Sequence, residues 1–196
     1  LTGILATVGL IIGSLTVTGM AITFSSDLTH IAGENTYILL VMGAITSLIL
    51  GLGLTVTACY LFLAITLAPA VVQQGLNTLA VHMFVLYWGV LSDITPPVCM
   101  AAFASASIAR SHPMQTGFEA MRLGGILYFI PFYFVLNPVL VLQGFTISGF
   151  LIAFGTAIVG IILIVAGLQG YLLGIGRLGD GIAGWSTRVP LIVGGI

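Results

Sequence analysis

The chain has 196 residues, of which 59% are hydrophobic and only 5% are charged, and its formal net charge is −1. A soluble domain carries about 25% charged residues because its surface faces water, whereas lipid allows an exterior as apolar as the core. These values exclude a soluble domain, and four arginines without any lysine exclude a basic surface for nucleic acid. Cys59 and Cys99 stand far apart without metal-ligand spacing, which indicates small buried residues.

The first apolar segment, residues 3–24, is long enough to cross a bilayer, which takes about 20 residues. Residues 25–36 hold two acids and a histidine and predict a polar loop. The next apolar run, 37–50, has 14 residues and would be about 21 Å long as a helix. That length is too short to cross the bilayer.

A glycine-rich stretch, residues 51–55, separates this short run from a second apolar segment at 56–72 that ends near Pro69. The two segments are short helices that meet at this glycine-rich stretch. The sequence therefore predicts a re-entrant hairpin over residues 37–72.

The segment 77–110 is apolar at both ends and interrupted by residues 92–97, Ser-Asp-Ile-Thr-Pro-Pro. Pro96 and Pro97 remove backbone donors, and Pro96 forces the residue before it out of the helical region. Residues 77–110 are therefore predicted to form one crossing that is broken in the middle.

The rest of the chain alternates between polar and apolar segments. Residues 110–122 are predicted to form a loop, 124–142 a span kinked at two prolines, and 146–168 a regular span. Residues 170–188 are rich in glycine, and the last residues begin another span. The charged residues of these polar segments are Arg110, Glu119, Arg122, Arg177, Asp180 and Arg188.

The charges suggest an orientation. If the hairpin returns to the side it left, all four arginines fall on one side of the membrane, and Asp27 and Glu34 on the other. Arginines concentrate on the cytoplasmic side, so the hairpin is expected to enter from outside. The chain also starts and stops within apolar runs, at Leu1 and Ile196, and we interpret it as a piece of a longer membrane protein.

The two breaks, residues 51–55 and 92–97, contain the candidate residues for ion and substrate binding. Irregular backbone at membrane depth is costly unless it lines a cavity or is buried in protein, and transporters place ion and substrate sites at such points. Hydroxyl and carbonyl oxygens suit a hard cation such as sodium, which would be a coupling ion; no other cofactor is expected. The candidate ion- and substrate-binding residues are Gly51, Gly53, Thr55, Thr57, Ser92, Asp93, Thr95 and Pro96.

Asp93 is the one acid inside the segments predicted to lie in the membrane. Intramembrane carboxylates are expensive and usually functional, so Asp93 could ligate an ion, carry a proton or bond to free amides. The alternative is structural, because Asp and Ser are ordinary capping residues beside a proline turn. Both interpretations remain open.

Several motifs resemble a known family. Gly51-Leu-Gly-Leu-Thr-Val-Thr-Ala-Cys-Tyr60 resembles the second hairpin of the large permease subunit of tripartite ATP-independent periplasmic (TRAP) transporters. The stretch from His82 to Val98, with its Ile-Thr-Pro-Pro-Val core, resembles the broken helix of the same family, most closely that of the fused TAXI-type permeases. The likeness covers residues 1–145, and the additional membrane helices of 146–196 are less similar.

This resemblance implies an all-α elevator transporter of the bacterial or archaeal cytoplasmic membrane. Such permeases import small organic acids on a sodium gradient, with an extracytoplasmic solute-binding protein and a small membrane subunit or its fused equivalent. The chain would supply the second inverted repeat, the C-terminal half of the transport domain. Where this chain has Thr55, the family pattern has a proline, so Thr57 and Thr95 are the better candidates for sodium ligands.

Alternatives remain at this point. The chain could belong to a sodium- or proton-coupled carboxylate carrier without a binding protein, or to a membrane scaffold that transports nothing. No pattern for a protease or hydrolase site appears, so an enzyme is not expected. His82 and the aromatic residues of 128–134 are interpreted as packing or interfacial residues, and Arg110 and Arg122 as determinants of topology.

Overall fold

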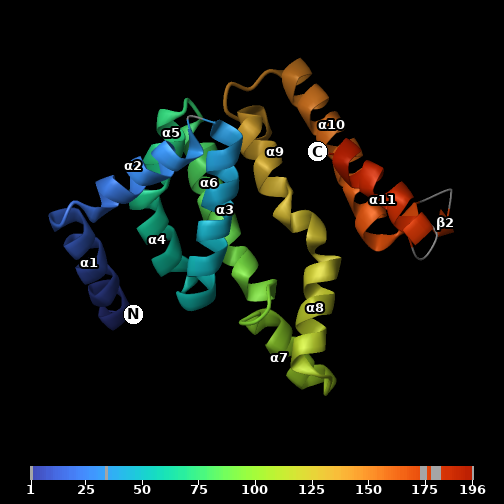
Figure 1. Cartoon of the computed structure of the whole chain (residues 1–196), viewed down its shortest axis with the longest axis horizontal. Helices are drawn as coiled ribbons and strands as arrows, with labels where there is room; N and C mark the ends of the chain where they lie inside the picture. The colour runs from blue at the N-terminus through green and yellow to red at the C-terminus, as the bar shows by residue number, and fades with distance from the viewer. Residues whose placement is uncertain (1, 34, 173–175, 178–181, 196) are drawn as a thin grey trace. The chain divides into compact units, whose positions relative to one another are not determined.

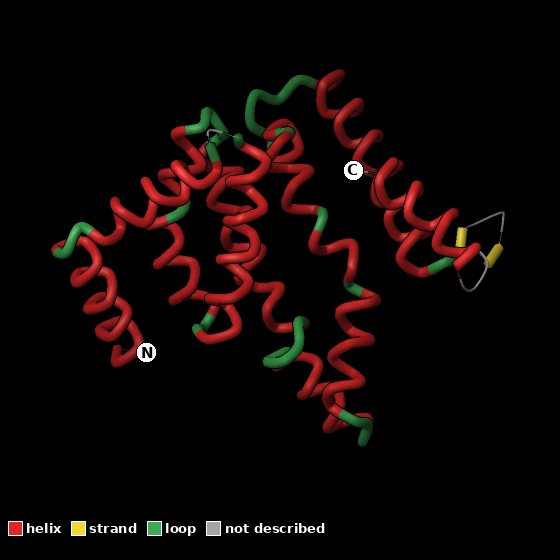
Figure 2. Tube along the Cα trace, viewed as in Figure 1, coloured by secondary structure: helices red, strands yellow, loops and turns green. Residues whose placement is uncertain are grey.

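The structure is a computed structural model that describes residues 2–33, 35–172, 176–177 and 182–195. Within these residues the fold is almost entirely helical, as predicted, with one pair of two-residue strands (Figure 1). Short loops join most of the helices (Figure 2). The chain divides into two compact units, Leu1–Asp93 and Ile94–Ile196, and each is described by itself.

The predicted span at 3–24 is wrong, because two helices meet inside it. Helix α1 covers Thr2–Val17, and helix α2 covers Met20–Ala32. Between them Gly19 adopts a left-handed conformation with φ 71°, which glycine takes at no steric cost. The Thr18 hydroxyl donates to the Ser14 carbonyl at 2.7 Å, and the same oxygen accepts from the Thr18 N–H at 3.0 Å.

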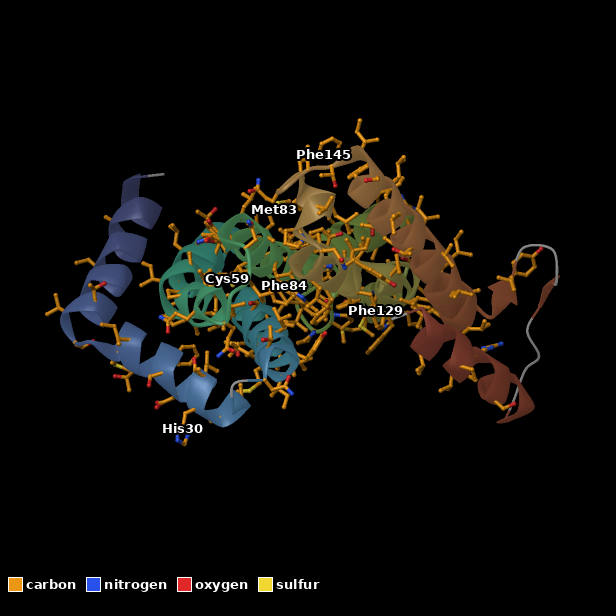
Figure 3. All side chains as sticks on the ribbon, turned by 90° about the horizontal axis from the view of Figure 1, so that it is seen from above. His30, Cys59, Met83, Phe84, Phe129 and Phe145 are labelled. Atoms are coloured by element: carbon orange, nitrogen blue, oxygen red, sulfur yellow. The ribbon has the colours of Figure 1, made fainter. Side chains whose placement is uncertain are left out.

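The predicted polar loop at 25–36 is wrong for most of its length, because α2 continues to Ala32. Leu28 and Ala32 are buried on one face, whereas Asp27 and His30 are exposed on the other. The His30 side chain projects away from the helix (Figure 3). Polar residues that seem to mark a loop thus form the outer face of an amphipathic helix. Glu34 lies outside the described residues.

Helix α3 is longer than predicted. It covers Thr36–Gly53, 18 residues, or about 27 Å, and its length and composition suffice to cross a membrane. The prediction that this arm is too short to cross is therefore wrong. Gly51 and Gly53 continue the helix, since a glycine costs a helix only about 1 kcal/mol relative to alanine. The re-entrant path of the hairpin stays a prediction.

The second arm follows the prediction with one additional break. Helix α4 covers Val56–Thr66 and helix α5 covers Ala68–Gln73, with Pro69 in the first turn of α5, where its missing N–H has no cost. Helix α6 covers Thr78–Leu91. Together α3, α4 and α6 enclose a core whose fully buried members include Leu39, Leu40, Leu63, Val81, Phe84 and Val85.

The predicted break at 92–97 is confirmed. Helix α6 gives way to a single 3-10 turn, η1, at Ser92–Ile94, and the peptide bond between Pro96 and Pro97 is cis. Helix α7 begins only at Met100 and runs over Met100–Ala109. The division between the two units also falls within this break.

The predicted loop at 110–122 is wrong, because helix α8 covers Pro113–Leu123. Pro113 occupies its first turn, and Gly117 is buried against Cys99 of the same unit. The polar residues of this segment lie along the exposed side of a helix, which a reading of composition alone cannot distinguish from a loop.

The predicted span at 124–142 is broken more sharply than a kink. It consists of η2 (Gly125–Tyr128), α9 (Ile130–Leu136) and η3 (Pro138–Val141). Pro131 lies in the first turn of α9 and Pro138 begins η3, which places each break near a missing backbone donor. The segment Gly125–Leu136 is bent by 64° relative to α8.

The predicted span at 146–168 is confirmed as helix α10, Ile147–Gln169, which is long and apolar enough to cross a membrane. Strands β1 (Tyr171–Leu172) and β2 (Gly176–Arg177) pair antiparallel, and helix α11 covers Ile182–Gly194. Arg188 therefore lies within a helix instead of a loop, with its guanidinium group against Gly170 at the end of α10. Asp180 lies outside the described residues.

Candidate functional site

At the hairpin tip, the Thr55 side chain caps the start of helix α4. Helix α3 ends at Gly53, and the Leu54 N–H donates to the Leu50 carbonyl at 3.0 Å. Thr55 is extended and precedes α4, where its hydroxyl accepts a hydrogen bond from the Ala58 N–H at 3.4 Å. Thr55 is therefore an N-cap, a role that proline cannot fill.

Thr57 differs from Thr55 although both side chains are exposed. It lies in the first turn of α4, two residues after the N-cap. The helix does not need its hydroxyl for capping, because Thr55 already supplies that acceptor. Of the two predicted threonines at the tip, Thr57 is thus the one whose oxygen remains available to a ligand.

One residue from each predicted break, Gly51 and Ser92, lies at a contact within the first unit. A Cβ atom built on Gly51 would lie 2.9 Å from the carbonyl oxygen of Gly89 and 3.0 Å from the Ser92 hydroxyl oxygen. Ser92 is buried, and its hydroxyl donates to the Gly89 carbonyl at 2.7 Å. The end of α3 and the end of α6 are therefore in direct contact at Gly51.

The same face of α3 continues this contact with residues that the sequence analysis missed. Ser47, one turn before Gly51, is buried and donates to the Gly43 carbonyl at 2.7 Å. The Cys59 thiol donates to the Ser47 carbonyl at 3.5 Å. Cys59 lies inside the bundle (Figure 3), as its apolar surroundings in the sequence predict. The spacing of Gly43, Ser47 and Gly51 at four-residue intervals is the signal that could have indicated this face.

Helices α4 and α6 are joined by a polar contact between side chains. The Tyr60 hydroxyl lies 3.2 Å from Nδ1 of His82, and the two rings form an edge-to-face pair with centroids 6.0 Å apart. This contact agrees with the interpretation of His82 as a packed residue. It also holds the second arm of the hairpin against the helix that leads to the second break.

Asp93 lies in the 3-10 turn η1 and is partly buried. Its carboxylate makes no hydrogen bond or ion pair with any other described residue. The capping role considered for it from the sequence is therefore not realised, and its oxygens face no competing donor among these residues.

Thr95 and Pro96 belong to the second unit. Thr95 is buried, and its hydroxyl oxygen lies 2.6 Å from the hydroxyl oxygen of Tyr128 in η2. The Thr95 carbonyl accepts from the Cys99 N–H at 3.2 Å, and the Pro96 ring contacts Gly117. Tyr128, interpreted from the sequence as a residue facing lipid or packing at the interface, is thus the partner that holds Thr95.

Both breaks lie within a segment that matches a known protein family. Residues 1–149 match the family model described as "Tripartite ATP-independent periplasmic transporter, DctM component". The chain belongs to this family. It is therefore part of a TRAP transporter membrane permease, as its motifs predict, and not of an enzyme family. Among curated proteins and among solved structures, no match was found. The predicted domain boundary at 145 stays a prediction.

Proposed function

We propose that this permease imports small organic acids and is driven by a sodium gradient. In this proposal an extracytoplasmic solute-binding protein delivers the substrate, and a small membrane subunit or a fused equivalent completes the complex in the cytoplasmic membrane. Membership of the TRAP family supports the proposal, and the geometry at Gly51 supports the part that concerns the ion.

The observation that carries the proposal is the contact between two helix C-terminal ends. Helix α3 ends at Gly53 and α6 ends at Leu91, and they meet where Gly51 contacts Gly89 and Ser92. The last carbonyl groups of a helix have no intrahelical donor, and each C-terminus carries a partial negative charge of about half an electron. Two such ends in contact repel each other, and a cation nearby would reduce this repulsion.

The oxygen ligands that the two break regions offer suit sodium. They are backbone carbonyls at the end of α3, the Thr57 hydroxyl and the Asp93 carboxylate, which is unpaired among the described residues. Hard cations prefer oxygen ligands of this type. Within the part of the chain that the structure describes, no three His, Cys, Asp or Glu side chains form a cluster for a softer metal.

The opposite end of the tip suits the carboxylate of an organic acid. Helix α4 begins at Val56, and its first amides point towards the tip, where they lack intrahelical acceptors. The Thr55 hydroxyl engages only the Ala58 amide, which leaves the amides of Val56 and Thr57 for an anion. A bound cation and a bound carboxylate would thus stabilise each other at this tip.

The test is the thermal stability of the full-length parent permease in detergent, measured in sodium and in potassium or choline at equal ionic strength. A ligand that binds only the folded state stabilises it by RT ln(1 + [L]/Kd). We expect a saturable rise in Tm that is specific to sodium. Thr57→Val should reduce that rise while leaving the Tm in potassium unchanged.

Equal Tm values in all cations would contradict sodium coupling. A rise in Tm on acidification that is lost in Asp93→Asn would then identify a proton-coupled carrier, for which the unpaired carboxylate is the specific indication. If neither ion affects the permease, the two breaks are packing elements of a scaffold.

A further inference from the structure

Helix α8 has one polar and one apolar face. Met114, Phe118 and Met121 recur at intervals of four and three residues, and Met114 and Phe118 are exposed, the latter by 54%. The remaining faces carry the polar residues Gln115, Thr116, Glu119 and Arg122. Glu119 and Arg122 form an ion pair at 3.5 Å. This pattern is typical of a helix between an apolar and an aqueous phase.

The corner before α8 has the same mixed character. Ile108 is 86% exposed at the end of α7, and Arg110 and His112 are exposed in the three-residue connection to α8. Arg110 has no carboxylate partner among the described residues, whereas the charge of Arg122 is offset by Glu119. The corner therefore combines exposed apolar side chains with a net positive charge.

The bend after α8 indicates how the helix is oriented. The segment Gly125–Leu136 is apolar and is bent by 64° relative to α8. If this apolar segment lies steeply in the bilayer, α8 runs close to the plane of the membrane. An orientation along the surface also keeps Glu119 and Arg122 out of the hydrocarbon, where charged side chains are costly.

We propose that the α7–α8 corner, residues 108–123, docks on the anionic headgroup layer of the membrane. Ile108, Met114 and Phe118 enter the boundary between headgroups and acyl chains. Arg110 and His112 bind lipid phosphate groups beside them. The occupant is an anionic glycerophospholipid, because the corner offers cations and apolar side chains together and carries no unpaired acid among its described residues.

The first test measures the Tm of the full-length parent permease in neutral detergent while phosphatidylglycerol or phosphatidylcholine is added. We expect a saturable rise in Tm with phosphatidylglycerol. Salt at 0.5 M should weaken this rise, because salt screens surface charges and the Debye length is only about 10 Å already at 0.1 M. The double variant Arg110→Gln, His112→Gln should lose at least half of that rise. The matched control Arg177→Gln removes a positive charge from strand β2 instead and should keep the full rise. An equal rise in all three proteins would overturn the proposal.

A second test does not depend on charge. Phe118→p-benzoylphenylalanine in the full-length permease, irradiated in native membranes, should yield adducts with the mass of a phospholipid. The matched control Phe134→p-benzoylphenylalanine lies at a buried aromatic position of the same unit and should yield far fewer. A protein-sized adduct at Phe118 would show that a partner subunit or a second copy covers this face. That result, or lipid labelling no greater than at Phe134, would overturn the proposal.

Discussion

Gly51 lies so close to Gly89 that a methyl group on Gly51 would approach the Gly89 carbonyl oxygen to 2.9 Å. The obstacle is backbone, so it cannot rotate away as a flexible side chain would. The contact joins the hairpin to the broken helix, and both its residues lie in the first unit. A single added methyl group at Gly51 therefore tests whether stability and sodium binding require this contact.

Gly51→Ala is expected to lower the stability of the permease. Overpacking of a well-packed contact costs typically about 1–3 kcal/mol, and the added methyl group would push α3 away from α6. The Tm in detergent without sodium measures this effect. The sodium-dependent rise in Tm should fall as well, because the two helix ends separate.

Gly53→Ala is the matched control for this substitution. Nothing lies within 4 Å of a Cβ atom on Gly53, and alanine favours a helix over glycine by about 0.5–1 kcal/mol. The Tm of Gly53→Ala should therefore be unchanged or slightly higher. A loss of stability equal to that of Gly51→Ala would show that the contact at Gly89 is not the cause.

Thr55 and Thr57 should respond differently to the loss of their hydroxyl groups. Thr55→Val removes the N-cap of α4 and should cost about 0.5–2 kcal/mol, so that the Tm falls equally in sodium and in potassium. Thr57→Val should lower only the rise that sodium produces. The comparison requires the Tm of each variant and of the unchanged permease, both in sodium and in potassium. If Thr57→Val reduces the Tm in potassium as much as in sodium, Thr57 has a structural role and not a role in ion binding.

Thr95 and Tyr128 form a pair that a double-mutant cycle can measure. Their hydroxyl groups are 2.6 Å apart, and a hydrogen bond contributes about 0.5–1.5 kcal/mol. Thr95→Val and Tyr128→Phe should each lower the Tm, and the double variant should be little worse than either single one. Thr156→Val is the control, because the Thr156 hydroxyl bonds only within its own helix, to Ile152 and Ala153. Strictly additive losses would mean that the two hydroxyl groups do not interact.

The sequence predicts those features that depend on local sterics. Pro96 and Pro97 mark the end of α6, and the uninterrupted apolar run from 147 marks α10, because neither depends on what packs nearby. Helices α2 and α8 are missed, since the polar residues on their outer faces have the same composition as a loop. The length of α3 is missed for a different reason. The small cost of two glycines in a helix is outweighed by the close approach to α6, and that contact joins residues 38 positions apart.

In the candidate site, too, the sequence predicts local features but not contacts between distant residues. Gly51 and Ser92 could be selected from the sequence because each stands at a break in an apolar segment. Their contact could not be derived, since no periodicity indicates which helix faces Gly51. Ser47, Gly89 and Tyr128 are missed because each acts through a partner that is distant in the sequence.

The Tyr60–His82 contact yields the last prediction. It lies between α4 and α6, one turn of α4 beyond Thr57, and its hydroxyl–imidazole distance is 3.2 Å. Tyr60→Phe removes the hydroxyl but keeps the ring that packs edge-to-face on His82. We expect a modest loss of about 0.5–1.5 kcal/mol, seen as a lower Tm in sodium and potassium alike, with an unchanged sodium affinity. Tyr37→Phe, at an exposed position of α3, is the control and should leave the Tm unchanged. A weaker sodium affinity in Tyr60→Phe would mean that the second arm transmits its position to the tip, and that the ion site extends along α4 beyond Thr57.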